Sequence, residues 1–412
     1  MRAAQANRAT PVVIVGAGLV GTLLAIVLAR RGCRVDVYER LPALRRGKRW
    51  TGRSINLTLC TRGFAALDRA GVGDAVRALV VRVRGRALHG GDKPATFLPY
   101  GPNDEALFAI DRGELSAVLL DQAQRVADIH FHFGQSCTGL NLDEHRIEFT
   151  NTATGERISR SDGLILGADG AFSTVRLSLQ RLYNFNYSQQ YSSSSYVELP
   201  IVPSGHSDWT SRTDFLHLWP RGRSMLLAIP NRDGTFTGTL LLPSRGAASH
   251  ESLIDAPELR AFLRERFPDA VDHIPNLEEA YFSARPIPMV TIRCNPWSYR
   301  GRVLLIGDAA HAVFPSYGQG ANAGFEDCIM LNECFDLCKG DWEAICPLFE
   351  ERRRPHMDVI AALSEQHLDD LRDTMGGADF ALRSRVETRL TEIFPDAYRS
   401  LYGMVAFTCM PY

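Results

Sequence analysis

The amino-acid sequence predicts an α/β protein in which a discontinuous nucleotide-binding domain carries an inserted antiparallel β-sheet domain and a helical C-terminal region. Three observations predict this class. A glycine-rich turn at residues 16–21 follows the first apolar run, two later apolar runs end shortly before Asp169 and Asp308, and residues 186–284 alternate apolar and polar side chains. Parallel strands that feed helices form doubly wound sheets, whereas alternation over short runs is typical of antiparallel strands.

Composition and charge exclude several classes of protein. The chain has 412 residues, enough for two or three domains, and a net charge of −1, which gives no field that favours nucleic acid or an acidic membrane surface. Its nine cysteines are scattered without a CxxC pair, so we expect free thiols in the cytoplasm and no metal site. Residues 11–29 are apolar enough to suggest a signal peptide or a membrane span, but glycines at defined offsets and the lack of a cleavage site argue against both.

The N-terminal elements are expected to form a βαβ unit. Residues 12–15 are predicted to be a buried strand, residues 19–30 a helix and residues 34–38 a second strand that ends at Glu39. The crossover between two parallel strands is right-handed, so the helix covers one face of the sheet. Glu39 follows Gly18 by 21 residues, where a carboxylate can accept hydrogen bonds from a ribose diol.

The turn inside this unit reads Gly16-Ala17-Gly18-Leu19-Val20-Gly21. In such a turn the first glycine permits the tight bend, the second lets the backbone approach a pyrophosphate, and the third lets the helix pack closely on the strand. The free N–H groups at the helix start favour phosphate. The unit can bind NAD or FAD, and an ordinary glycine-rich turn is the structural alternative.

The remaining elements follow from periodicity. Helices are predicted at residues 61–82, 113–127 and over most of 308–397; strands are predicted at residues 130–133, 147–150, 163–167, 213–219 and 235–242; the serine run 192–195 is predicted to be a loop. The predicted domains are residues 1–85, 104–185 and 285–340 for the cofactor domain, residues 86–103 and 186–284 for the β-rich substrate domain, and residues 341–412 for the helical C-terminal region.

Two more motifs favour FAD over NAD as the cofactor. Residues 167–176, GADGAFSTVR, and the Gly307-Asp308 pair with the glycine-rich helix start after it resemble signatures of flavin-dependent aromatic hydroxylases. The resemblance implies a Rossmann-like FAD-binding domain in a p-hydroxybenzoate hydroxylase-like fold. It places Asp308 on the ribityl chain and residues 318–321 against the isoalloxazine ring, whose negative charge in the reduced state a helix N-terminus stabilises. No second GxGxxG occurs, so NADPH is expected to bind transiently.

Several longer motifs are more specific. They are GRSINL at residues 52–57, YSQQY at 187–191, LHLWP at 216–220 and NAGFED at 322–327. With these motifs the chain resembles the kynurenine 3-monooxygenase family over nearly its whole length. The resemblance implies a flavin monooxygenase that uses NADPH and O2 to hydroxylate L-kynurenine, or a close analogue, ortho to the aniline nitrogen. The product would be 3-hydroxykynurenine, formed through a C4a-hydroperoxyflavin.

The resemblance also implies a site for the amino-acid head group of the substrate. The family's arginine and tyrosine that hold the carboxylate correspond to Arg86 and Tyr100, and an arginine fork suits a carboxylate. A second family tyrosine corresponds to Tyr412. A family asparagine falls on His367, or on Gln366 if the alignment slips by one residue, and a solvent-facing helical histidine is the structural alternative.

The expected cofactor contacts come from the glycine motif, the end of the second strand, the two aspartate motifs and single positions that the resemblance assigns. They are Gly16, Gly18, Val20, Gly21, Tyr38, Glu39, Arg40, Arg53, Arg112, Asp169, Asp308, Gly320, Ala321 and Asn322. Each side chain also has a purely structural interpretation; Arg112, for example, starts a predicted helix.

The sequence departs from the family at Ser316, where an aromatic residue is usual. A serine there suggests a larger or wetter pocket and a modified kynurenine as substrate. Eukaryotic members carry a longer C-terminal segment that is associated with membrane attachment, and without it we expect no membrane partner. Two alternatives stay open: a hydroxylase of a different aromatic compound, and a non-catalytic protein with a flavin-binding fold. The sequence gives no signal for oligomeric state.

Overall fold

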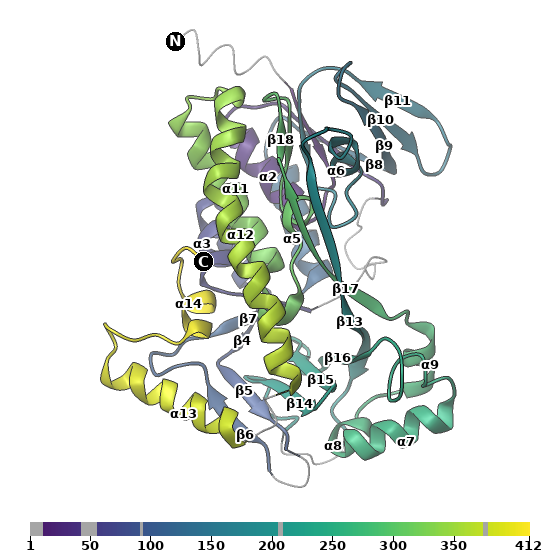
Figure 1. The fold of residues 1–412 in the computed structure, drawn as a ribbon, viewed down its shortest axis with the longest axis vertical. Coiled ribbons are helices and arrows are strands. Elements are labelled where there is room, and N and C mark those ends of the chain that lie inside the picture. Colours follow the sequence, from purple (N-terminus) through teal and green to yellow (C-terminus); the bar gives the residue numbers. More distant parts are fainter. Residues whose placement is uncertain (1–10, 43–55, 91–93, 205–208, 374–377) are drawn as a thin grey trace.

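The computed structural model describes residues 11–42, 56–90, 94–204, 209–373 and 378–412 (Figure 1). Its upper half is built on a six-stranded sheet whose strands, in spatial order, are β18 (Ser298–Tyr299), β19 (Val303–Leu305), β12 (Leu164–Gly167), β1 (Val12–Val15), β2 (Val35–Glu39) and β8 (Ile129–Phe133). All neighbours except β18 run parallel. Parallel strands present their carboxyl ends at one edge of a sheet, and ligands of open α/β sheets bind outside that edge.

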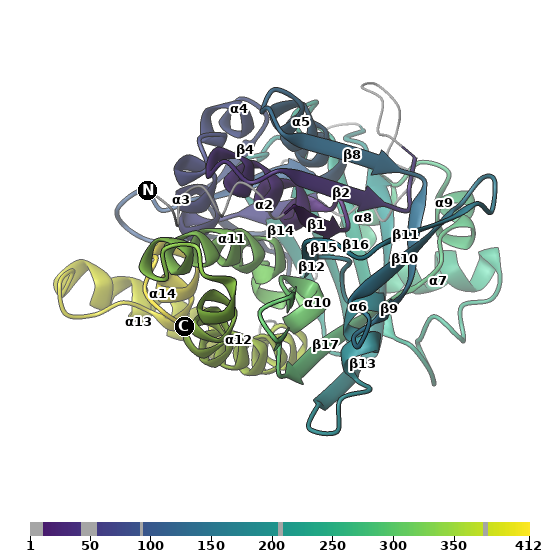
Figure 2. The ribbon, with the colours of Figure 1, turned by 90° about the horizontal axis from the view of Figure 1, so that it is seen from above.

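Helices flank this sheet. Figure 2 shows α11 (Gln319–Leu337) between α2 (Leu19–Arg30) and α12 (Trp342–Asp373), in agreement with their contacts. The other helices of this half are α3 (Thr61–Arg69), α4 (Gly73–Arg77), α5 (Arg112–Gln124), α6 (Thr174–Leu179), α10 (Asp308–His311) and the 3-10 turn η1 (Pro315–Tyr317). Two three-stranded sheets complete it: β3 (Asn56–Leu59), β7 (Leu107–Asp111) and β4 (Val81–Val83); and β11 (Arg157–Arg160), β10 (Arg146–Asn151) and β9 (Gln135–Asn141).

The lower half is a seven-stranded sheet. Its strands, in spatial order, are β17 (Ile287–Asn295), β13 (Asn186–Ile201), β16 (Phe236–Pro243), β15 (Ser224–Pro230), β14 (Leu216–Arg221), β5 (Gly85–Leu88) and β6 (Thr96–Pro99). One face packs on α7 (Ala256–Arg266), α8 (Pro268–Val271) and α9 (Leu277–Ser283), and the other face carries a separate core that includes Leu218, Met225 and Leu241. The α/β class with an inserted antiparallel sheet is confirmed, and the domain boundaries stay a prediction.

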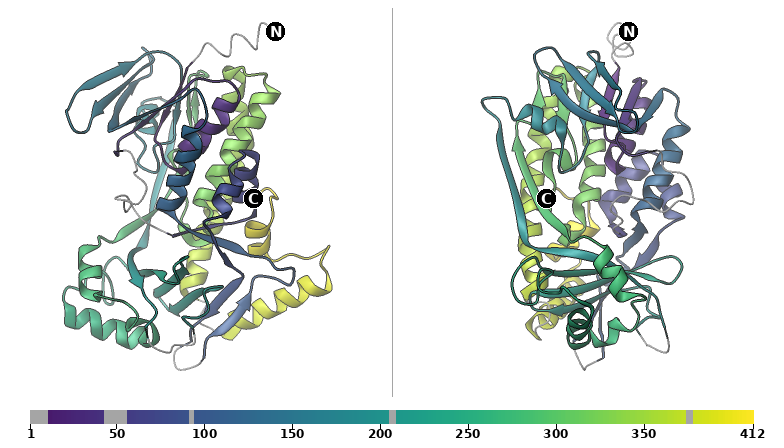
Figure 3. Two further views of the ribbon diagram at one scale, coloured as in Figure 1. Left: turned by 180° about the vertical axis from the view of Figure 1, so that it is seen from behind. Right: turned by 90° about the vertical axis from the view of Figure 1, so that its right-hand side faces the viewer.

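Figures 1 and 3 show α7 and α13 (Ala378–Ile393) on opposite sides of the lower half. After α13 the chain forms the short helix α14 (Leu401–Phe407) and returns toward α3. Within the described parts of the chain, no helix combines the length and apolarity that a bilayer span requires.

Two local predictions were wrong. The serine run 192–195 lies inside β13, where a register shift after Tyr191 lets Ser194 and Ser195 pair with β16. Such a bulge accommodates small polar residues that periodicity assigns to a loop. Residues 61–82 do not form one helix, because Gly71, with φ +66°, ends α3 and its turn leads into α4 and then β4.

Candidate active site

The glycine turn after β1 is fixed by close backbone contacts on two of its glycines. A Cβ on Gly16, whose φ is +102°, would lie 2.5 Å from the carbonyl oxygen of Ala168, and a Cβ on Gly21 would overlap the carbonyl oxygen of Gly16. A Cβ on Gly18 would meet nothing within 4 Å. The turn therefore excludes side chains where α2 meets β1 and leaves its middle glycine open to a ligand.

Helix α2 begins on that open glycine. Gly18 occupies the N-cap position and no side chain caps the helix, whereas Asp111, Ser173 and Ser400 cap α5, α6 and α14. The first N–H groups of α2 are left for a ligand, and phosphate is the group that such a helix start favours. The Glu39 carboxylate accepts from the backbone N–H of Ala17 at 2.8 Å, so the expected ribose acceptor lies beside the turn.

A second uncapped helix start lies at α11. Gly318, with φ +66°, is its N-cap, and no side chain caps it. A Cβ on Gly320 would have the exposed Asp308 carboxylate, at 4.0 Å, as its nearest neighbour. The acid and the bare helix start therefore face the same open space, with Ala321 half-buried beside it.

Val20 joins the two glycine-rich segments. Its side chain lies 3.2 Å from a Cβ built on Gly307 and 2.5 Å from one built on Gly324. Any larger residue at those glycines would push α2 away from α10 and α11. The side chain of Val20, which the sequence assigned to the cofactor, is a packing contact that sets the distance between the two helix starts.

Three other expected cofactor residues have side chains engaged with protein groups. Tyr38 is 2% exposed and stacks on Phe149, and Asn322 is 0% exposed and donates to the carbonyl oxygens of Thr58 and Gly318. The Asp169 carboxylate accepts from Ser173 Oγ and from the N–H of Thr174, at the start of α6. The side chains of Tyr38 and Asn322 are therefore engaged in packing and in hydrogen bonds within the protein, and their predicted contacts with the cofactor stay a prediction.

The structure describes two of the three arginines that were predicted to contact the cofactor. Arg40 is exposed directly after β2, and Arg112 is half-buried as the first residue of α5. Arg53 lies outside the described residues. The residues present nevertheless fit FAD: two helices start without a side-chain cap and pack on each other through Val20, with a ribose acceptor at Glu39 beside one start and the acid Asp308 beside the other.

Away from these two helix starts, a cavity of about 210 Å³ lies between β5, α12, α13 and α14. Arg86 of β5 lines it, with its guanidinium carbon 3.9 Å from the centre of the Tyr402 ring and 5.6 Å from that of Tyr100. Its neighbours Arg82 and Arg84 pair with Asp104 and Asp214. Arg86 pairs with no carboxylate of the described residues.

The charge of Arg86 is retained. Burial alone would lower the pKa of its guanidinium, but the hydroxyls of Tyr402 and Tyr100 outweigh burial and raise it. A half-buried cation without an anionic partner is unfavourable, so this arginine is suited to an anionic ligand that binds through two parallel hydrogen bonds.

Two further buried polar atoms in this cavity have no partner of good geometry among the described residues: Tyr100 Oη and His367 Nε2. Burial raises the pKa of Tyr100 well above its usual value. Burial, and then the nearby charge of Arg86, lowers the pKa of His367 to about 3, so its imidazole is neutral at physiological pH. Each unsatisfied group costs about 1–3 kcal/mol, which a polar ligand would recover.

The structure places Arg86, Tyr100 and His367 together as predicted, but it does not place Tyr412 with them. Tyr402, ten positions earlier, lines the cavity and stacks on Tyr317 at 5.7 Å. The sequence prediction of Tyr412 is corrected to Tyr402, because α14 turns the chain back toward α3 before its last residues. Gln366 and His367 both line the cavity, but only His367 is buried.

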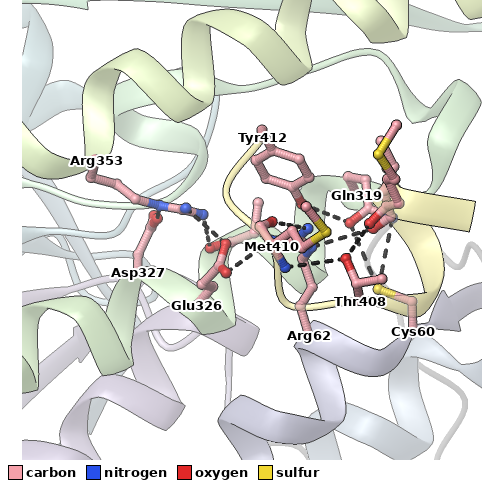
Figure 4. Close-up of polar contacts among 12 residues, drawn as sticks. Cys60, Arg62, Gln319, Glu326, Asp327, Arg353, Thr408, Met410 and Tyr412 are labelled. Carbon is pink, nitrogen blue, oxygen red and sulfur yellow. Dashed lines mark hydrogen bonds and ion pairs between the residues drawn. The ribbon is translucent and has the colours of Figure 1, made fainter. Parts of the chain in front are cut away.

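Figure 4 shows where Tyr412 lies. Its ring is 3.8 Å from the guanidinium carbon of Arg62, and its hydroxyl donates to Gln319 Oε1 at 2.8 Å. Arg62 also pairs with Glu326 and donates to the carbonyl oxygen of Met410, both at 2.9 Å. Tyr412 therefore anchors the C-terminal segment to the start of α11.

The same network of ion pairs extends to the Gly307-Asp308 turn. Glu326 also pairs with Arg353 at 2.7 Å, and Arg353 pairs with Asp327. Asp327 accepts from the backbone N–H of Gly307 at 3.0 Å and pairs with His311 at 2.6 Å. These buried charges hold the Gly307-Asp308 turn in place against α11.

Ser316 does not open the cavity as the sequence suggested. Its hydroxyl donates to the carbonyl oxygen of Ser364 at 2.6 Å, which ties η1 to α12. The aromatic wall comes from the next residue, Tyr317, which stacks on His367 at 4.1 Å. The hypothesis of a wetter pocket near residue 316 therefore has no support in these contacts.

A family model described as "FAD binding domain" matches residues 9–337. A kynurenine 3-monooxygenase of Flavobacterium psychrophilum is 40% identical over 98% of this chain and 90% of its own, and one of Anopheles gambiae is 36% identical over 97% and 82%.

Among solved structures, 2-methyl-3-hydroxypyridine-5-carboxylic acid oxygenase is similar with a TM-score of 0.71 at 24% identity, covering 95% of this chain and 98% of its own. Klebsiella pneumoniae HpxO, complexed with FAD and uric acid, has a TM-score of 0.71 at 21% identity, covering 94% and 95%. These two likenesses support the fold. On the sequence matches and the family model, the chain belongs to the kynurenine 3-monooxygenase family of FAD-dependent aromatic monooxygenases.

Proposed function

We propose that this protein hydroxylates L-kynurenine, or a close analogue, ortho to the aniline nitrogen, with FAD as cofactor, NADPH as electron donor and O2 as oxidant. The observation that carries the proposal is the half-buried Arg86, which pairs with no carboxylate of the described residues and shares its cavity with two buried polar atoms that lack a hydrogen-bond partner there, Tyr100 Oη and His367 Nε2. An amino acid with an aromatic side chain matches this cavity, and the curated relatives are named for kynurenine.

Arg86 binds the substrate carboxylate in this proposal. Its fork donates two hydrogen bonds, and Tyr100 Oη donates a third. Neutral His367 accepts or donates one hydrogen bond through Nε2 without adding charge. The rings of Tyr317 and Tyr402 stack beside them and exclude water, which strengthens these charge-assisted bonds.

The chain needs no strong base for the aromatic step. FAD, when bound, supplies the redox chemistry that takes electrons from NADPH and delivers oxygen to the ring. The aniline nitrogen of the substrate supplies electron density to its own ring, so no phenol has to lose a proton. The protein's part is to position the ring, to exclude water and to place the uncapped start of α11, with its positive dipole end, beside the flavin.

The test is product identification by mass spectrometry. Purified FAD-loaded protein is incubated with L-kynurenine, NADPH and air, and the expected product is 3-hydroxykynurenine in amounts that match NADPH oxidation. NADPH oxidation that yields peroxide and returns unchanged kynurenine would overturn the proposal. Ring-substituted kynurenines run in parallel decide between the plain and the modified substrate, since equal or better turnover of plain kynurenine removes the modified one.

A further inference from the structure

The substrate cavity carries negative as well as positive charge. Asp370 of α12 and Glu387 of α13 line the same cavity as Arg86. Asp370 follows His367 by three positions, so the two side chains lie on the same side of α12. The carboxylate of Asp370 therefore lies one helix turn from the neutral imidazole beside Arg86.

Tyr317 shows that the two opposite charges are close to one point. Burial raises the pKa of its hydroxyl to about 12; Arg86 opposes this shift and Asp370 adds to it. Coulomb energy falls with distance, so Arg86 and Asp370 both lie close enough to Tyr317 to act on its hydroxyl. Arg383 lines the cavity too, so the lining carries two cations and two carboxylates, and Asp370 is the carboxylate that shares a helix with His367.

The second carboxylate belongs to a different helix. Glu387 Oε1 is 3.1 Å from Arg383 Nε, four positions earlier on α13. Arg383 is largely exposed and also feels the charge of Asp370 from the facing helix. Glu387 is therefore the matched comparison for Asp370: it has the same charge and lines the same cavity, but it does not share a helix turn with His367.

We propose that Asp370 determines specificity by binding the α-ammonium group of a substrate whose carboxylate lies on Arg86. A free α-amino acid carries both charges on adjacent groups, which is the pattern that the cavity presents. The proposal rests on the proposed function and adds a requirement to it: the protein selects zwitterionic amino acids over carboxylic acids of the same shape.

Ligand binding to the FAD-loaded protein tests this by isothermal titration calorimetry, without NADPH and without air, so that nothing turns over. The two probes are L-kynurenine and desamino-kynurenine, the oxobutanoate that lacks only the α-amino group. Wild type is expected to bind kynurenine about tenfold or more tightly than the desamino compound, as a charge-assisted hydrogen bond predicts. Equal affinities would overturn the proposal, whatever any variant does.

The variant D370N is expected to weaken kynurenine binding about tenfold and to leave the desamino compound within about twofold. The control variant E387Q should change neither affinity by more than about twofold. Equal loss of both ligands in D370N, loss of neither, or a selective loss in E387Q would each contradict the assignment. Failure of wild type to bind kynurenine at all identifies a failure of the proposed function itself.

Discussion

The glycine-rich starts of α2 and α11, which we call the flavin cradle, and the cavity around Arg86 are built in opposite ways. The cradle is made by backbone: Gly18 and Gly320 leave open space, and two helices begin without a side-chain cap. The cavity is made by side chains, with Arg86, Tyr100, Tyr402 and His367 contributed by elements that are far apart in the chain. If the proposed function holds, a cofactor shared by many enzymes is bound through main-chain geometry, whereas a particular substrate is bound through side chains that can be exchanged.

This difference predicts that the largest loss follows from disturbing the cradle backbone. In G21V the added side chain overlaps the carbonyl oxygen of Gly16, so α2 must shift away from β1. We expect FAD affinity to fall more than about a hundredfold and the apoprotein to melt several degrees lower, in line with overpacking. Flavin fluorescence titration and thermal melts measure both quantities.

The matched control is G18A. Its Cβ would meet nothing within 4 Å, so the apoprotein should melt as wild type does while FAD binds more weakly. If G21V keeps normal FAD affinity, or if G18A destabilises the apoprotein, the cradle is not a rigid backbone site and the comparison fails.

Effects of intermediate size are expected from replacing Tyr402, which lines the cavity, and Tyr412, which does not. Y402L removes the ring beside Arg86 and is expected to raise KM for kynurenine about tenfold, since a cation–π contact at a desolvated site contributes about 1–2 kcal/mol. Y412L removes the ring on Arg62 and the hydrogen bond to Gln319, so it should lower the melting temperature and leave KM within about twofold. Steady-state NADPH oxidation and melts report both. A KM effect in Y412L as large as that in Y402L would show that the corrected assignment is wrong.

The smallest expected effect concerns acid stability. His367 is neutral in the folded state because its pKa is lowered to about 3, whereas the unfolded chain binds a proton near its ordinary value of about 6.5. Its contribution to stability is therefore complete above pH 6.5 and decreases as the pH falls toward 3. H367N removes the histidine whose protonation in the unfolded chain lowers the stability at acid pH. When the pH is lowered from 7.5 to 5, the free energy of unfolding should therefore fall less in the variant than in wild type. Urea titrations at both pH values measure the difference; parallel losses would contradict the buried, neutral histidine.

The geometry of the glycine turn could be predicted from the sequence because it is local, and that these residues contact FAD stays a prediction. Gly16, Gly18, Gly21 and Glu39 lie in one βαβ unit, and their spacing alone fixes their arrangement. The fold class followed from the same unit and from alternation in residues 186–284. What the sequence could not show was that the side chain of Val20 packs between Gly307 and Gly324, because that contact joins segments nearly 300 positions apart.

The cavity was predicted only in part. Arg86 and Tyr100 were predicted by resemblance, but residues 400–412 contain two tyrosines, and neither periodicity nor composition distinguishes them. Their positions depend on Ser400 capping α14 and on Arg62 holding the carbonyl oxygen of Met410, which are contacts that only the folded chain makes. The proposed contribution of Asp370 could not be read from the sequence for the same reason: an acid on an amphipathic helix is ordinarily interpreted as part of a solvated face.

Arg62 gives the protein one further property. Its guanidinium donates to the carbonyl oxygens of Val405 and Met410, so a single side chain holds the segment at a point inside α14 and at a point beyond it. The part of this segment that lines the cavity, with Tyr402, and the part that ends at Tyr412 therefore rest on the same guanidinium. We expect exchange of residues 400–412 with a relative to keep substrate contacts and anchorage together only where the relative also has an arginine at this place on α3.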